Sequence, residues 1–139
     1  MTQWQPGMII TADRLNDGPP VITTASGLAA GTDFAINDFR GAKTGKMVVL
    51  DMYLARTGAD IAQTGGNIVS PEPVCCTVPS GWRPTNGTIN GSWDNGSSEG
   101  GFVIGTDGVC TLRTASSNIS GTTGSGVSNL RLHVSFIQT

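Results

Sequence analysis

Apolar and polar residues alternate along most of the chain after residue 20, which is the pattern of half-buried β-strands. The longest run is KMVVLDMYLAR at 46–56, in which every second residue from Val48 to Leu54 is apolar and the residues between them are mixed. The final run, NLRLHVSFI at 129–137, alternates in the same way. Each strand is therefore expected to bury one side completely and to need partial cover on the other.

A β-hairpin is predicted at 101–112, GFVIGTDGVCTL, because an Asp-Gly pair separates two short apolar runs and Gly108 can adopt a positive φ without strain. Shorter strands are expected at 34–36, 68–70, 74–78 and 85–93. Pro71 and Pro73 break the chain between the strands at 68–70 and 74–78, which is typical of a sheet edge. Short strands, frequent turns and the absence of a helical crossover predict an all-β fold, an antiparallel β-sandwich of the jelly-roll kind.

Residues 1–20, MTQWQPGMIITADRLNDGPP, differ from the rest of the chain. They contain a Pro-Gly turn, and they end in a Pro-Pro pair that a sheet cannot extend across. We therefore divide the 139 residues into an extended N-terminal arm at 1–20 and a β-sandwich domain at 21–139, which is long enough to bury a core. The apolar residues of the arm are too few to bury one another, so we expect them to dock on a partner protein or to fold back onto the sandwich. They are Trp4, Met8, Ile9, Ile10 and Leu15.

Composition and charge restrict the partners. Charged residues make up only 13% of the chain and the net charge is −2, so there is no basic stripe for the phosphates of a nucleic acid. No apolar run approaches the roughly 20 residues that a membrane-spanning helix needs. The first ten residues lack both a positive charge and a long apolar segment, which predicts synthesis in a cytoplasm as a soluble protein without a secretory signal.

The reactive side chains do not predict an enzyme, a metal centre or a cofactor. Cys75, Cys76 and Cys110 lack the spacing of a zinc site, so we expect buried, reduced thiols. No motif places a nucleophile beside His133, the only histidine. Two dispersed carboxylates could still meet in space as a glycosidase needs, and the loop at 92–101 could offer oxygens to calcium although it lacks EF-hand spacing.

Two tryptophans with polar neighbours are the candidate contacts for a glycan or a partner. Trp82 lies in the turn-like segment GWRP, and Trp93 precedes a loop rich in Asn, Gly and Ser at 94–100. An aromatic face beside amide groups suits a sugar ring, but each tryptophan suits a core equally well, and Arg83 suits a solvated surface. The candidate contact residues are Trp82, Arg83, Trp93, Asp94 and Asn95.

Three segments of the chain carry a family resemblance. They are VPSGWRPTNGTINGSW at 78–93, GGFVIGTDGVCTL at 100–112 and NLRLHVSFI at 129–137. Together they resemble the C-terminal domains of tail-fibre and minor tail proteins of tailed bacteriophages. The opening segment WQPGMIITADRLN is similar to the start of small virion proteins in phages of actinobacteria. The resemblance covers most of the chain.

The resemblance implies a jelly roll like that of tumour necrosis factor, a homotrimer, and a non-enzymatic role on the virion surface after synthesis in the host cytoplasm. Two locations stay open. One is that of a capsid decoration (cement) protein, which the arm anchors to the major capsid protein. The other is that of a minor tail or tail-fibre tip protein, which is bound to a tail protein and contacts a host receptor or cell-surface glycan. The chain has no coiled coil or collagen-like shaft, which favours the first location, although a threefold axis suits both. A wall-degrading hydrolase and a lectin outside phages are the rival classes.

Overall fold

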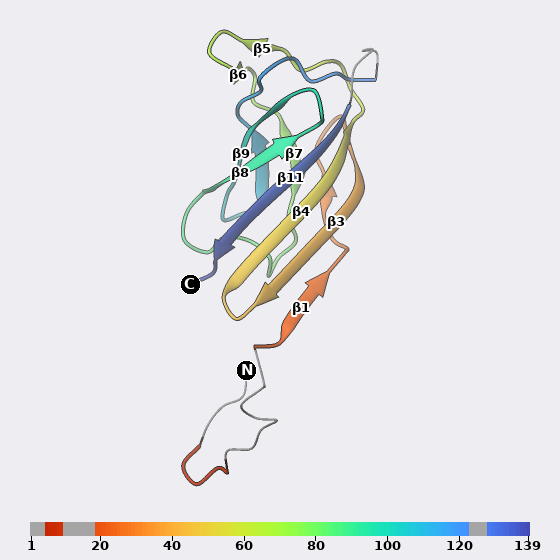
Figure 1. Ribbon diagram of the computed structural model, residues 1–139. Helices are drawn as coiled ribbons and strands as arrows, with labels where there is room; N and C mark the ends of the chain where they lie inside the picture. Colours follow the sequence, from red (N-terminus) through yellow and green to blue (C-terminus); the bar gives the residue numbers. More distant parts are fainter. Residues whose placement is uncertain (1–4, 10–18, 123–127) are drawn as a thin grey trace.

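The computed structural model describes residues 5–9, 19–122 and 128–139, and these residues form an all-β fold (Figure 1). The strands in chain order are β1 (Val21–Thr24), β2 (Ala29–Ala30), β3 (Phe34–Thr44), β4 (Met47–Arg56), β5 (Gln63–Thr64), β6 (Ile68–Val69), β7 (Val74–Thr77), β8 (Ile89–Asp94), β9 (Glu99–Ile104), β10 (Val109–Leu112) and β11 (Asn129–Ile137). Within the described ranges there is no α-helix, and hence none long and apolar enough to cross a membrane.

Nine of the strands form one antiparallel sheet in the order β1-β3-β4-β11-β8-β9-β10-β7-β2. β4 and β11 are joined along nine residue pairs, whereas β11 and β8 share only three. The sheet curls across this narrow join, so that β7 and β9 lie behind β3, β4 and β11 (Figure 1). The predicted antiparallel β-sandwich is therefore confirmed, and its two layers belong to one large curled sheet.

The two ends of the curled sheet are also tied together by the chain, because β2 leads directly into β3. In the link between them, the Gly31 amide donates to the Cys75 carbonyl at the start of β7, with an N–O distance of 2.9 Å. The Thr57 amide, just after β4, donates to the Asp33 carbonyl at 2.8 Å. The two residues of β2 pair with the outer side of β7, and β5 and β6 form a separate small sheet.

The hydrophobic core lies between the two layers. In β4 and β11 every second side chain is buried and the residues between them are half-buried or exposed, as the alternation predicts. Large, fully buried side chains on facing strands include Leu50, Met52 and Leu54 of β4, Leu130 and Leu132 of β11, and Phe102, Ile104 and Leu112 of the rear layer. Since burying such a side chain contributes roughly 1.5–3 kcal/mol, the contact between the layers is the main source of stability.

The strand expected at 34–36 is longer than predicted, because β3 continues well beyond it. Phe34, Ile36 and Phe39 all pack against the core, which breaks a period of two. A register shift relative to β4 between Ile36 and Asp38 absorbs the extra residue. A β-bulge of this kind re-aims the side chains that follow it, so the alternation in the sequence stops although the strand does not.

The predicted hairpin at 101–112 is confirmed by the antiparallel pairing of β9 and β10. Gly108 has a φ of +84°, and its amide donates to the Gly105 carbonyl at 2.9 Å. The Asp107 carboxylate accepts from the Val109 amide at 3.0 Å. The Asp-Gly pair makes the turn because the glycine supplies the positive φ and the carboxylate closes the loop.

Two adjacent glycines in β9 provide a test of how closely the segment after β10 packs beside this strand. A Cβ on Gly100 would overlap the Thr114 carbonyl oxygen, whereas a Cβ on Gly101 would meet no atom closer than 3.4 Å. We expect Gly100→Ala to lower the free energy of unfolding by about 1–3 kcal/mol, as overpacking does, and Gly101→Ala to leave it nearly unchanged. Urea denaturation followed by tryptophan fluorescence measures both variants. Equal losses would contradict the close approach at Gly100.

Candidate functional site

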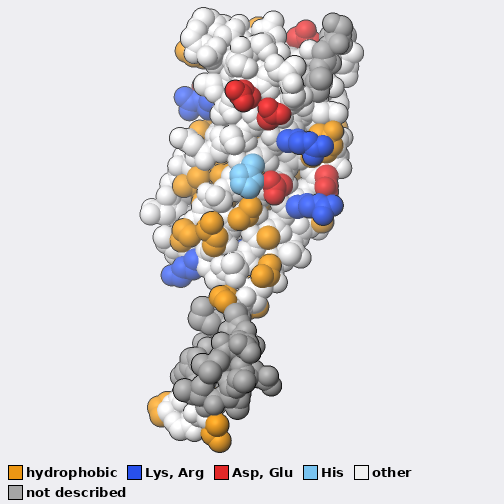
Figure 2. Space-filling view, in the orientation of Figure 1, with side chains coloured by type: hydrophobic (Ala, Val, Ile, Leu, Met, Phe, Trp, Pro, Cys, Tyr) orange, Lys and Arg blue, Asp and Glu red, His pale blue; other side chains and the backbone are white. Residues whose placement is uncertain are grey.

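The outer face is the surface of β1, β3, β4, β11 and β8 that is turned away from the core. Residues directly opposite each other in antiparallel strands point to the same side, so the register arranges the outer side chains in rows. The first row consists of Asp38, Tyr53, Arg131 and Asp94, and the second of Arg40, Asp51, His133 and Ser92. Figure 2 shows the histidine and the charged side chains gathered in the middle of this face. We call these two rows the charged half.

Two further rows cross the same face closer to the end at which β1 begins. They consist of Thr23, Ala42, Val49 and Ser135, and of Val21, Thr44, Met47 and Ile137. None of these residues carries a charge, and Val21, Met47 and Ile137 are large exposed hydrophobic residues. We call these two rows the apolar half. The outer face is therefore divided along the strands into a charged half and an apolar half.

An ion pair, a hydrogen bond between histidine and aspartate and a stacked arginine organise the charged half. His133 Nδ1 lies 2.7 Å from Asp51 Oδ1, and both side chains are more than half exposed. Arg40 Nε donates to the carboxylate of Asp38 at 3.0 Å, and this hydrogen bond lowers the pKa of Asp38. The Arg131 guanidinium stacks on the Tyr53 ring, 4.0 Å from its centroid, which orients an otherwise flexible side chain.

A small cavity of about 240 Å³ opens beside this arginine. We call it the Arg131 pocket, and its lining residues are Tyr53, Asp94, Asn95, Gly96, Asn129 and Arg131. The turn after β8 forms one wall: Asp94 Oδ1 accepts from the Gly96 amide at 2.8 Å, and Asn95 Oδ1 accepts from the Ser98 amide at 2.6 Å. These bonds are Asx-type turns, in which the side chain replaces a backbone acceptor. The shape of this wall is therefore determined by hydrogen bonds within the segment 94–98 itself.

The structure separates the candidate contact residues of the 92–101 segment. Asp94 and Asn95 line the Arg131 pocket, but Trp93 points to the opposite side of β8, because neighbouring residues in a strand face opposite ways. Trp93 is only 2% exposed, and its Nε1 donates to the Thr114 carbonyl at 3.0 Å. Of the two alternatives for this tryptophan, the structure therefore gives the core position, with no ring face open for a sugar.

Trp82 and Arg83 do not line the pocket. Trp82 is buried beneath Lys43, whose Nζ lies 4.8 Å from the ring centroid, and it packs close to Gly41 of β3. Arg83 Nε donates to the Val78 carbonyl at 2.7 Å. Trp82 thus occupies a core position, and Arg83 is held by a backbone hydrogen bond and is only partly exposed.

Of the five apolar residues of the arm, Trp4, Ile10 and Leu15 lie outside the described residues. Met8 and Ile9 belong to the described segment 5–9, where the Met8 amide donates to the Gln5 carbonyl at 3.1 Å and Gly7 has a φ of +82°. The expected Pro-Gly turn is therefore confirmed. Ile9 is 78% exposed, and Figure 1 shows this segment beyond the end of the sandwich at which β1 begins.

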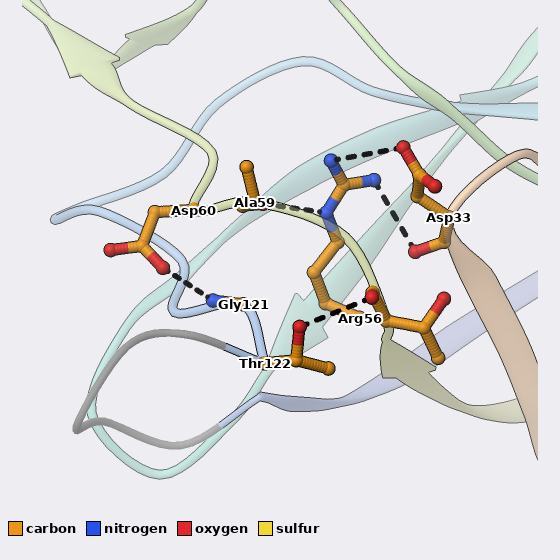
Figure 3. Close-up of polar contacts among 7 residues, drawn as sticks. Asp33, Arg56, Ala59, Asp60, Gly121 and Thr122 are labelled. Carbon is orange, nitrogen blue, oxygen red and sulfur yellow. Dashed lines mark hydrogen bonds and ion pairs between the residues drawn. The ribbon is translucent and has the colours of Figure 1, made fainter.

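A second polar cluster lies at the C-terminal end of β4, around Arg56 (Figure 3). Arg56, whose side chain is almost buried, donates from Nε to the Ala59 carbonyl at 2.9 Å and stacks over the Phe34 ring. Asp60 Oδ1 accepts from the Gly121 amide at 2.7 Å. The first bond holds the loop after β4 to its own strand, and the second joins that loop to the segment before β11, as does a hydrogen bond from the Thr122 hydroxyl to the Thr57 carbonyl. We therefore interpret the cluster as a structural clamp.

The three thiols lie together in the core. Cys76 is paired with Cys110 across β7 and β10, and a register shift after Cys110 allows Cys75 and Cys76 to be buried although they are consecutive. All three are free cysteines in this structure and all three are buried, so the expected burial of the thiols is confirmed. Hydrogen bonds with Cys110 and Cys75, together with burial, raise the pKa of the Cys76 thiol.

Thiol reactivity provides a direct test of this arrangement. Because the thiolate is the nucleophile, buried thiols and a raised pKa at Cys76 should make the folded protein inert to a disulfide reagent at mildly alkaline pH. After unfolding in guanidinium we expect all three cysteines to react. A thiol in the folded protein that reacts as fast as in the unfolded chain would contradict the burial.

Sequence reasoning did not predict the pocket residues Tyr53, Asn129 and Arg131 as a site. Its only signal for Tyr53 and Arg131 was their place on the mixed sides of two long strands. Among known proteins, the sequence matches no family model, and no curated protein shows significant similarity to it. The phage resemblance therefore stays a prediction from the sequence.

Proposed function

We propose that the protein is a non-enzymatic structural protein of a bacteriophage virion surface, and that it is a capsid decoration (cement) protein. In this proposal it is a homotrimer, and residues 1–20 anchor it to the major capsid protein. The resemblance of 78–93, 100–112 and 129–137 to phage proteins supports the virion assignment. The observation that carries the proposal is the apolar half, which lies at the end of the sandwich where the N-terminal segment departs.

The apolar half is the surface that suits contact between subunits. The buried centre of a protein interface is depleted in charge, and these two rows contain no charged residue. Ile137 is 56% exposed and Met47 lies directly opposite it on β4. Contacts through this half would leave the charged half and the Arg131 pocket open to solvent.

The arm suits attachment to a larger particle. Burial of Trp4 and Ile9 on a partner would contribute on the order of 3–5 kcal/mol, part of which offsets the entropy lost when the segment becomes ordered. Three arms on one trimer bind together, so a modest affinity per arm becomes a strong attachment.

The first test of the proposal is the oligomeric state. We expect sedimentation equilibrium at micromolar concentration to report three times the chain mass of 14.3 kDa. Ile137→Asp should shift the protein towards monomer, because three charges would be brought into an apolar contact. Ile68→Asp is the matched control, since Ile68 is 50% exposed on β6, outside the apolar half. A monomeric wild-type protein would overturn the trimer, and dissociation of both variants would contradict the assignment of the contact.

Deletion of residues 1–18 tests the anchor. We expect the shortened chain to keep its melting temperature and its trimeric state, because β1 begins only at Val21. It should no longer co-sediment with phage particles that lack the protein. Binding at full-length occupancy would show that the arm is not the anchor, as would failure of the shortened chain to fold. The full-length protein mixed separately with isolated capsids and isolated tails distinguishes the two locations.

The second candidate function is that of a minor tail or tail-fibre tip protein that binds a host receptor or surface glycan. The Arg131 pocket favours it, because Asp94 and Asn95 meet an oriented arginine there on the outer face. In this form of the proposal the arm binds a tail protein in place of the capsid protein.

A further inference from the structure

The charges of the Arg131 pocket restrict the ligand that it can accept. Arg131 and Asp94 are directly opposite on β11 and β8, so the pocket brings together one positive and one negative side chain. Glu99, opposite Asp94 on β9, adds a negative charge outside the pocket. An anionic ligand would meet two carboxylates and a cationic ligand would meet the guanidinium. A neutral ligand can hydrogen-bond to both Arg131 and Asp94 and is repelled by neither.

The pocket places a hydrogen-bond donor, Arg131, beside an acceptor, Asp94. The guanidinium of Arg131 lies on the Tyr53 ring, which leaves the N–H groups in its plane available as donors. The Asp94 carboxylate uses Oδ1 for the Gly96 amide but has lone pairs for further bonds. Adjacent hydroxyl groups on one ring each donate and accept, so a pair of them matches an arginine beside a carboxylate.

Size and rigidity narrow the ligand further. The cavity of about 240 Å³ is smaller than the roughly 300–1,000 Å³ of sites for drug-sized molecules, so it suits a single ring. Its wall is already ordered, because the Ser97 and Ser98 amides both donate to Asn95 Oδ1 and the Asn95 amide donates to the Ser98 carbonyl. Little conformational entropy remains to be lost when a ligand binds.

We propose that the Arg131 pocket binds one neutral sugar unit of a glycan, with Asp94 accepting from its hydroxyl groups and Arg131 donating to them. This inference rests on the glycan-binding form of the proposed function for its biological use. The binding itself is measured on the isolated full-length protein, without a particle. If the predictions about the arm or the trimer fail, the sugar measurement can therefore still be interpreted. If no sugar binds, the tests of the arm and the trimer are unaffected.

The test is a titration of the isotope-labelled protein with glucose, galactose, mannose and N-acetylglucosamine, followed by NMR of the backbone amides. We expect saturable shifts for at least one of these sugars, centred on Tyr53, Gly96 and Arg131. Glucuronate, which adds a carboxylate to the same ring, should bind at least about tenfold more weakly, because Asp94 and Glu99 repel it. Absence of saturable shifts with all four neutral sugars would overturn the proposal, as would equal binding of glucuronate.

Two variants assign the binding to the pocket. Asp94→Asn keeps the Oδ1 acceptor for the Gly96 amide but removes the charge, and Arg131→Gln removes the guanidinium from an exposed position. Each should lower sugar affinity at least about tenfold with little change in melting temperature, because a charged hydrogen bond is lost. Arg40→Gln is the matched control on the same face, since Arg40 is exposed and does not line the pocket. If both pocket variants retain wild-type affinity, or the control loses as much, the site is not this pocket.

Discussion

The pairing of β4 with β11 is the constraint on which the rest of the structure depends. Their nine residue pairs join segments that lie about half the chain apart, and the register places Leu50 opposite Val134 and Asp51 opposite His133. A slip by one residue would turn every core side chain outward and every polar one inward. The hydrophobic side of both strands therefore sets the register, and the polar side follows from it.

The outer face is a consequence of that register. Polar residues at alternate positions of β3, β4, β11 and β8 become neighbours across strands, so Arg131 lies between Tyr53 and Asp94. The same geometry brings Val21, Met47 and Ile137 into one row. A rigid sheet thus carries two chemically different surfaces, an uncharged one beside the N-terminal segment and a charged one with a small pocket. Beyond the sheet itself, the pocket adds one turn, which is closed by its own Asx hydrogen bonds.

Two bulges mark the places where local pattern and fold diverge. In β3 the extra residue between Ile36 and Asp38 lets Phe39 reach the core out of phase with Phe34. At β7 and β10 the shift after Cys110 buries two consecutive cysteines. In both places a large or polarisable side chain is buried in the core. This burial offsets the backbone pairing between strands that the bulge disrupts at one residue.

The sequence by itself determined the all-β class, the strands around 47–56 and 129–137, and the hairpin with Asp107 and Gly108 at its turn. These features depend on the alternation of apolar and polar residues and on the positive φ that glycine allows in a turn. Both are properties of short segments of sequence. It also indicated that Tyr53 and Arg131 face away from the core. Only the tertiary structure decided that they meet Asp94, that Trp93 points inward, and that the apolar half is contiguous. His133 and Asp51, 82 residues apart, illustrate the reason: alternation specifies which side of a strand a residue occupies, whereas its cross-strand partner is set by the packing of the whole core.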